Sequence, residues 1–198
     1  MSTETVNLEC PGCGAPANTS QRFCSFCKGP IIISTFTSVA SMGLPLLQKY
    51  ANSYRDALTH TPGNPQINLS AGMCYLKLRL YDKALEAFER TIEADFDNSE
   101  VYFYSAVSLF KGQRPFLSNR STIDRALALL QAGISIEPRA IYLYYDAFIR
   151  HDYFERKFFR VNPNYLITLE KARKTGLSEH DVEALHDLLS VPRPSVLA

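Results

Sequence analysis

The sequence predicts a mainly α-helical protein, a solenoid of antiparallel helix pairs with a small β module at its N-terminus. Three observations support this prediction. Four of the five cysteines form two Cys-x-x-Cys pairs before residue 28. From residue 45 onward, apolar residues recur with the period of amphipathic helices. Within that stretch, small and large residues return at matching places in successive segments, as in stacked repeats.

The composition is that of an ordinary globular protein. Of 198 residues, 46% are hydrophobic and 21% are charged, so the chain can bury a core and is not expected to be disordered. Lys and Arg total 21 against 20 Asp and Glu, and this balance excludes a whole-protein attraction to nucleic acid or to a membrane surface. Residues 1–9 lack a basic stretch and an apolar core, so we expect no secretory signal and a cytoplasmic location.

One uncharged segment, between Lys28 and Lys49, is long enough to cross a bilayer. It is rich in Ser and Thr, and Gly43 and Pro45 would interrupt a helix there. We therefore expect no membrane span.

The N-terminal cysteines have the spacing of a metal site. Cys10 and Cys13 form one pair, and Cys24 and Cys27 form the other. A two-residue gap lets both sulfurs of a pair reach one ion, and four thiolates complete a tetrahedral shell with no position for water. One structural Zn²⁺ is therefore expected, with no catalysis at the metal. Iron would fit the same thiolates, whereas a redox pair would need a surrounding βαβ pattern that this segment lacks.

Residues 8–30 resemble a short zinc ribbon, whose two knuckles have the forms C-P-x-C-G and F-C-x-x-C-G. The chain matches with C-P-G-C-G over residues 10–14 and F-C-S-F-C-K-G over residues 23–29, where Lys28 displaces the second glycine by one place. The resemblance implies a β ribbon over residues 1–36, followed by a linker over 37–44. Such a module is too small to bury a core, so metal must supply its folding free energy. Chelation is expected to unfold it and to leave the rest of the chain folded.

Residues 65–98 resemble one tetratricopeptide repeat. In a 34-position frame from Pro65, the small residues stand at positions 7, 8 and 20 and the large ones at 11, 17, 24 and 28: these are Ala71, Gly72 and Ala84, then Tyr75, Tyr81, Phe88 and Ile92. Small residues let two antiparallel helices approach closely, and large ones fill the gaps between repeats. The resemblance implies a helical repeat domain over residues 45–198.

The same frame extends in both directions from this repeat. Upstream, a half-repeat ends at Asn64. Downstream, Ser99 is expected to cap a helix whose partner covers residues 123–136, with eight extra residues within Lys111 to Arg120. A helix is then expected over 141–159, and a terminal capping hairpin over about 162–176 and 178–190. In this hairpin, Asn162 and Pro163 start the first helix, and Ser178 with Asp181 forms a capping box for the second.

The sequence has no pattern of an active site. A nucleophile elbow, a glycine-rich phosphate loop and a His-Glu-x-x-His helix are all missing from it. His180 and His186 are six residues apart, which places them on different helix faces. Cys74 falls at a packing position of its repeat. We therefore expect a protein that is not an enzyme.

In tetratricopeptide proteins, the first helix of each repeat lines a concave groove, which implies a peptide-binding groove in this chain. The groove positions are mostly apolar: Leu69, Met73, Leu76, Lys77, Phe103, Val107, Phe110 and Lys111. Such a groove suits a peptide or an amphipathic helix of a partner protein. The expected function is a non-enzymatic adaptor, with the ribbon as a second docking module. The alternative is that residues 30–47, or a second copy in a homo-oligomer, cover these apolar side chains.

A second functional hypothesis is an accessory factor that binds nucleic acid. Residues 101–160 contain nine Lys or Arg and five Asp or Glu, interleaved with aromatic residues that can stack on bases. The ribbon and this region together offer five candidate contacts: Arg22, Lys28, Arg150, Arg156 and Lys157. An ordinary solvated face would carry the same charge, and aromatic residues at helical spacing usually form core.

Overall fold

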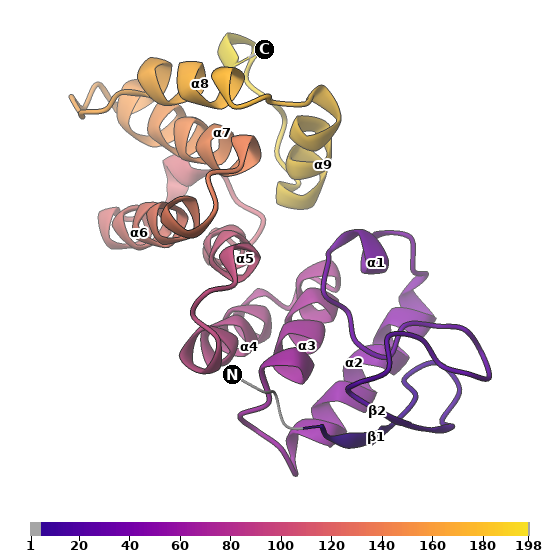
Figure 1. Ribbon diagram of the computed structural model, residues 1–198. Coiled ribbons are helices and arrows are strands. Elements are labelled where there is room, and N and C mark those ends of the chain that lie inside the picture. Colours follow the sequence, from indigo (N-terminus) through magenta and orange to yellow (C-terminus); the bar gives the residue numbers. More distant parts are fainter. Residues whose placement is uncertain (1–4, 198) are drawn as a thin grey trace. The chain divides into compact units, whose positions relative to one another are not determined.

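The computed structural model describes residues 5–197 (Figure 1). The chain forms two compact units, the first ending at Phe96 and the second beginning at Asp97. The predicted fold class is confirmed, because helices make up most of the described residues and a two-stranded sheet lies near the N-terminus. No helix within residues 5–197 combines the length and apolarity that a membrane crossing requires.

The first unit begins with the ribbon. Strand β1 (Asn7–Glu9) pairs antiparallel with β2 (Pro16–Asn18), so that Leu8 lies opposite Ala17. A second turn is closed by a bridge between Phe23 and Pro30. The buried centre of this module contains Cys10, Cys24 and Ile31. A core this small is consistent with the expectation that a metal holds the ribbon together.

The rest of the first unit is helical, with α1 (Thr37–Ala40), α2 (Leu44–Leu58), α3 (Pro65–Lys77) and α4 (Tyr81–Ala94). Helix α3 begins at Pro65 because Asn64 caps it, accepting a hydrogen bond from the Ile67 backbone nitrogen. It packs against α1, α2 and α4 and is buried over nine of its residues. Helix α1 lies within residues 37–44, where the sequence predicts a linker.

The second unit contains the helices α5 (Ser99–Leu109), α6 (Arg120–Ile136), α7 (Ala140–Ile149), α8 (Tyr165–Lys174) and α9 (Glu179–Leu189). Short helical turns lie between and after them: η1 (Pro115–Leu117), η2 (Arg150–Phe154), η3 (Glu155–Lys157) and η4 (Ser195–Leu197). Helix α7 packs against α6, α8 and α9, and its aromatic side chains form the centre of this unit.

The extra residues of the second unit lie where the frame predicts them, between α5 and α6. They are tied to the π turn η2 through Asp152, whose carboxylate is completely buried. Its oxygens accept hydrogen bonds from the Phe116 backbone nitrogen at 2.9 Å and from Arg114 Nη2 at 2.6 Å. Arg156 Nη1 donates a third bond at 2.7 Å. The sequence predicts a single helix over 141–159. In the structure this segment consists of α7, which ends at Ile149, followed by the π turn η2 and the turn η3.

Three predicted helix starts are wrong: that of α5 by one residue, that of α8, predicted at Asn162 and Pro163, by two, and that of α9 in its chemistry. Asn98 caps α5 in place of Ser99, because its side-chain oxygen reaches the Glu100 backbone nitrogen at 3.2 Å. Helix α8 begins after Asn164, which accepts a bond from Ile167. Ser178 occupies the N-cap of α9, but its side chain makes no capping bond, so the predicted capping box is not formed.

Candidate metal centre and predicted binding surfaces

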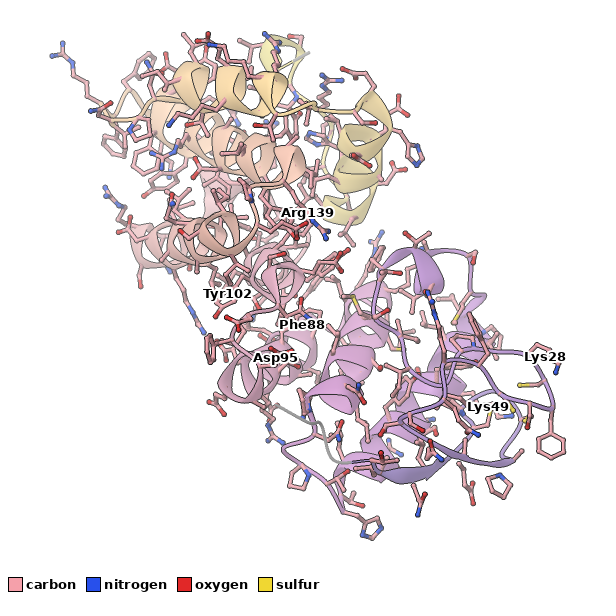
Figure 2. The ribbon with its side chains drawn as sticks, in the orientation of Figure 1. Lys28, Lys49, Phe88, Asp95, Tyr102 and Arg139 are labelled. Atoms are coloured by element: carbon pink, nitrogen blue, oxygen red, sulfur yellow. The ribbon has the colours of Figure 1, made fainter. Side chains whose placement is uncertain are left out.

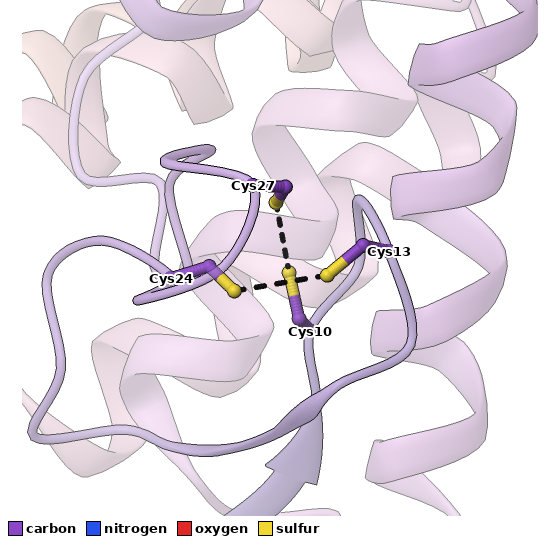
Figure 3. Close-up of side chains that lie close together, drawn as sticks. All are labelled: Cys10, Cys13, Cys24 and Cys27. Atoms are coloured by element: carbon purple, nitrogen blue, oxygen red, sulfur yellow. Dashed lines mark hydrogen bonds between the residues drawn. The ribbon is translucent and has the colours of Figure 1, made fainter.

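The four cysteines of the ribbon converge on one point (Figure 3), and all four sulfurs lie within 4.8 Å of one another. The Sγ atoms of Cys10 and Cys27 are 3.6 Å apart, and those of Cys13 and Cys24 are 3.7 Å apart. Zn–S bonds of about 2.3 Å place the sulfurs of a tetrahedron about 3.8 Å apart. The donor set and its spacing therefore fit one four-coordinate metal ion.

The backbone of the two knuckles aims the sulfurs inward. Gly14 has a φ of 80°, and its nitrogen donates a hydrogen bond to the Cys10 carbonyl at 2.8 Å. In the second knuckle, Lys28 has a φ of 61° and its nitrogen bonds the Cys24 carbonyl at 3.1 Å. Lys28 thus adopts the left-handed conformation that the ribbon pattern usually assigns to glycine. The second knuckle therefore closes with the same backbone hydrogen bond as the first, although Lys28 stands where the first knuckle has Gly14.

Backbone N–H groups lower the pKa of one of the four thiols. The N–H groups of Cys27 and Phe26 point at Cys24 and lower the pKa of its thiol to about 6. Burial raises the pKa of the Cys10 thiol in the absence of a cation. A bound divalent ion holds such thiols as thiolates. Cys24 therefore ionises more readily than Cys10 before metal arrives.

Helix α2 packs against the ribbon through Lys49, Tyr50 and Tyr54. Lys49 Nζ donates a hydrogen bond to the Gly12 carbonyl at 2.7 Å (Lys49 is labelled in Figure 2). Tyr50 is buried, and its hydroxyl lies 3.2 Å from where a Cβ on Gly12 would stand. Tyr54 donates its hydroxyl proton to the Ile31 carbonyl at 2.9 Å. Sequence analysis missed these residues, because an aromatic residue at helical spacing gives no sign of which element it will contact.

The contact between α2 and the second knuckle gives a test by substitution. A Cβ on Gly29 would lie 2.7 Å from the Tyr50 hydroxyl but 4.0 Å from the ring carbon that bears it. We expect Gly29→Ala to destabilise the metal-loaded first unit by about 1 to 3 kcal/mol, the usual cost of overpacking. Tyr50→Phe in the same chain should recover most of that loss.

The measurement is thermal unfolding with zinc bound, for both single variants and the double variant. Ser25→Ala, on the same knuckle with an exposed side chain, is the matched control and should unfold like the wild type. Equal losses for Gly29→Ala with and without Tyr50→Phe would contradict the predicted contact.

The predicted groove residues of the first unit lie on α3. Leu69, Met73 and Leu76 are buried, and Lys77 is half-buried. The chain itself packs on this helix, because the Ile33 nitrogen donates to Ser70 Oγ at 2.9 Å. The Ser70 hydroxyl is also within hydrogen-bonding distance of the Ile33 carbonyl, at 3.3 Å. Residues 31–40 thus lie against α3, in line with the alternative that the chain covers its own apolar side chains.

The predicted groove residues of the second unit lie on and just after α5. Phe103, Val107 and Phe110 are buried, whereas Lys111 is exposed. The Phe103 ring stacks on Tyr142 of α7 with 4.9 Å between centroids, and both phenylalanines contact the ring of Tyr145 edge-on. The groove assignment stays a prediction, and this packing sets a condition on it. A partner reaches these apolar side chains only after the segments that cover them move away.

The residues predicted to contact nucleic acid are engaged within the chain. Arg150 pairs with the buried Asp146 and donates to the Pro163 carbonyl at 2.9 Å. Arg156 pairs with Asp152, and Lys157 lies 4.0 Å from the centroid of the Tyr153 ring. In the ribbon, Arg22 lies over the ring of Phe23 at 5.7 Å, and Lys28 Nζ donates to the Ser25 carbonyl at 2.9 Å. The structure lends no support to nucleic-acid binding.

Cys74 and His186 are both buried; the sequence places Cys74 at a packing position but gives no such role to His186. Cys74 is completely buried, and burial raises the pKa of its thiol to about 12, which leaves it unreactive at neutral pH. His186 is buried with Nε2 2.9 Å from the Tyr144 hydroxyl and Nδ1 3.1 Å from the Val191 carbonyl. The contact with Tyr144 joins α9 to α7, and the contact with Val191 lies at the C-terminal end of α9 itself. His180 is exposed.

Known proteins support the helical repeat. Residues 51–104 match the family model of the tetratricopeptide repeat, which confirms the repeat predicted from Pro65. The chain resembles a crystal structure of MamA with a TM-score of 0.57 at 15% identity, over 81% of this chain and 91% of that one. It resembles MamA AMB-1 with a TM-score of 0.54 at 20% identity, over 80% and 75% of the two chains. The MamA RS-1 ArsTM double mutant gives 0.55 at 15% identity, over 71% and 70%. No curated protein sequence matches the chain.

Proposed function

We propose that this protein is a non-enzymatic adaptor that binds a segment of a partner protein through its helical repeats and uses the ribbon as a second docking module. The observation that carries the proposal is the tetratricopeptide-type solenoid, which joins one matched repeat to further helix pairs. Stacked repeats of this kind present extended surfaces to other chains. A cluster of thiolates favours one Zn²⁺, held for structure, in a reducing compartment such as the cytoplasm.

The ribbon supports the second docking module by what it exposes. Phe23 and Phe26 on the second knuckle are exposed by 56% and 73%. Because both rings are exposed, they add little to the folding of the ribbon itself. Aromatic residues are enriched at protein interfaces, and exposed apolar patches mark such interfaces. The metal fixes the backbone that carries them, so a partner meets a rigid pair of rings.

The proposal is tested by affinity purification of the zinc-loaded chain, with bound proteins quantified by mass spectrometry. Lys77→Glu with Lys111→Glu changes the charged edge of the predicted groove, and Phe26→Ala changes the ribbon. Lys83→Glu, on the second helix of the same repeat, is the matched control. We expect at least one protein retained by the wild type and by the control to be lost from one of the two altered surfaces. A set of bound proteins identical across all variants would refute the adaptor proposal.

A further inference from the structure

The most exposed large apolar side chain of the described residues lies in the second unit, just after η3. Phe158 is exposed by 93%, and its neighbour Phe159 by 51%. Leu166 and Ile167, at the start of α8, are exposed by 55% and 43%. Phe158 gains almost nothing from the fold, since its side chain remains in water, and the other three leave about half of their surface exposed. Several exposed apolar groups in neighbouring segments, unlike a single exposed residue, mark a surface that another molecule covers.

Phe158 also has a backbone conformation that favours a different residue. Its φ and ψ are 59° and 28°, in the left-handed region. The turn ends the helix, because the Phe159 nitrogen bonds the Phe154 carbonyl at 2.8 Å and the Phe158 nitrogen bonds the Glu155 carbonyl at 3.0 Å. Glycine is the residue that this position usually carries. Glycine at position 158 would therefore give a more stable fold than phenylalanine does.

A hollow of about 290 Å³ opens beside these rings. Its walls combine aromatic and aliphatic groups with two arginines, one carboxylate and one amide: Phe158, Phe159, Val161, Tyr165, Arg150, Arg160, Glu155 and Asn164. Small-molecule pockets usually span roughly 300–1,000 Å³. A hollow at the lower limit of that range suits one bulky side chain of a peptide, with its neighbours lying along the rim.

The charge around the hollow favours an acidic peptide. Residues 155–174 contain six Lys or Arg and two Glu; Arg156 pairs with Asp152 and Lys174 with Glu170, and the remaining residues still have an excess of cations. Arg150 is already held by Asp146, but Arg160 is exposed and makes no ion pair among residues 5–197. A cation in this position can pair with a carboxylate of a partner and fix the orientation of the segment.

We propose that the hollow between η3 and the start of α8 is a docking site for an acidic segment of a partner protein. A bulky apolar side chain of that segment enters between Phe158, Phe159 and Tyr165, and a flanking Asp or Glu pairs with Arg160. The proposal rests on the adaptor function proposed above and gives it a surface outside the buried groove positions. The side-chain-sized hollow favours a peptide over an anionic lipid surface, which would need no pocket.

The test is a selection of 12-residue peptides displayed on phage, on the zinc-loaded full chain, followed by fluorescence anisotropy with the enriched peptides. Phe158→Gly removes the ring while supplying the residue that its backbone favours, so it should unfold at or above the wild-type temperature. Arg160→Glu reverses the charge at the rim. Leu117→Ala, at a side chain of the same unit exposed by 69%, is the matched control.

We expect enriched peptides to combine an aromatic or leucine residue with Asp or Glu. Phe158→Gly and Arg160→Glu should each weaken their binding at least tenfold, and Leu117→Ala should leave it unchanged. Enriched peptides that bind all variants equally would overturn this site while leaving the adaptor function standing. A selection that enriches no peptide would count against both. Binding to vesicles of phosphatidylserine and phosphatidylcholine that Phe158→Gly abolishes, with no peptide enriched, would assign the surface to lipid instead.

Discussion

Removal of the metal is expected to unfold the ribbon and also to loosen α2 and α3, while the second unit keeps its helices. The sequence alone predicts that chelation leaves all the helices intact. The structure extends the effect, because Lys49 and Tyr54 of α2 bond the ribbon backbone and Ile33 bonds Ser70 of α3. Structural Zn²⁺ contributes on the order of 10 kcal/mol or more to small modules. Losing it removes the partner against which α2 packs.

Hydrogen exchange followed by mass spectrometry measures this directly, before and after treatment with a chelator. Peptides from α2 and α3 should exchange at least tenfold faster without metal, and peptides from α7 should not change. Cys10→Ser with Cys13→Ser should reproduce the effect, whereas Cys74→Ser, whose sulfur lies outside the cluster, should leave metal binding intact. Unchanged exchange in α2 after complete loss of zinc would show that the ribbon and the helices fold independently.

Substitution of Gly72 by alanine is expected to be the most damaging single methyl addition in the first unit. A Cβ at this position would lie 2.5 Å from Cε1 of Phe88, whose ring is completely buried between α3 and α4. The helices or the ring must move apart, which costs about 1 to 3 kcal/mol or more. Phe88→Leu in the same chain frees the space and should recover part of the loss.

Urea denaturation of the four chains of this cycle gives the interaction energy between the two sites. Gly63→Ala is the control, because a Cβ there meets nothing within 4 Å, and its stability should differ little from that of the wild type. If Gly72→Ala costs the same with Phe88 present or shortened, the two helices are not in the close contact that the repeat requires.

The features that the sequence predicts correctly are local in the chain. The repeat around Pro65 is set by spacings within 34 residues, and the cysteine cluster by two short pairs. The two helices of that repeat and the convergence of the four sulfurs therefore follow from short-range patterns alone. Helix starts are harder to predict, because Asn98 and Ser99 have similar capping chemistry and only the backbone geometry decides between them.

The features that the sequence does not predict depend on contacts between distant segments. Ile33 and Ser70 are 37 residues apart, as are Lys49 and Gly12. The charge count of residues 101–160 shows an excess of cations but not that Asp146 and Asp152 lie buried beside three of them. A carboxylate inside the fold neutralises an arginine that the sequence offers as a free contact.

The buried carboxylate of Asp152 determines where the chain accepts engineering. The ten residues that follow α5 are tied near their middle, through Arg114 and Phe116, to a group that water does not reach. Lengthening or cutting the chain there would take two hydrogen bonds from this buried carboxylate and leave it with Arg156. The turn at Gly63, where a Cβ would meet nothing within 4 Å, is the better place for an epitope tag or a fluorescent reporter.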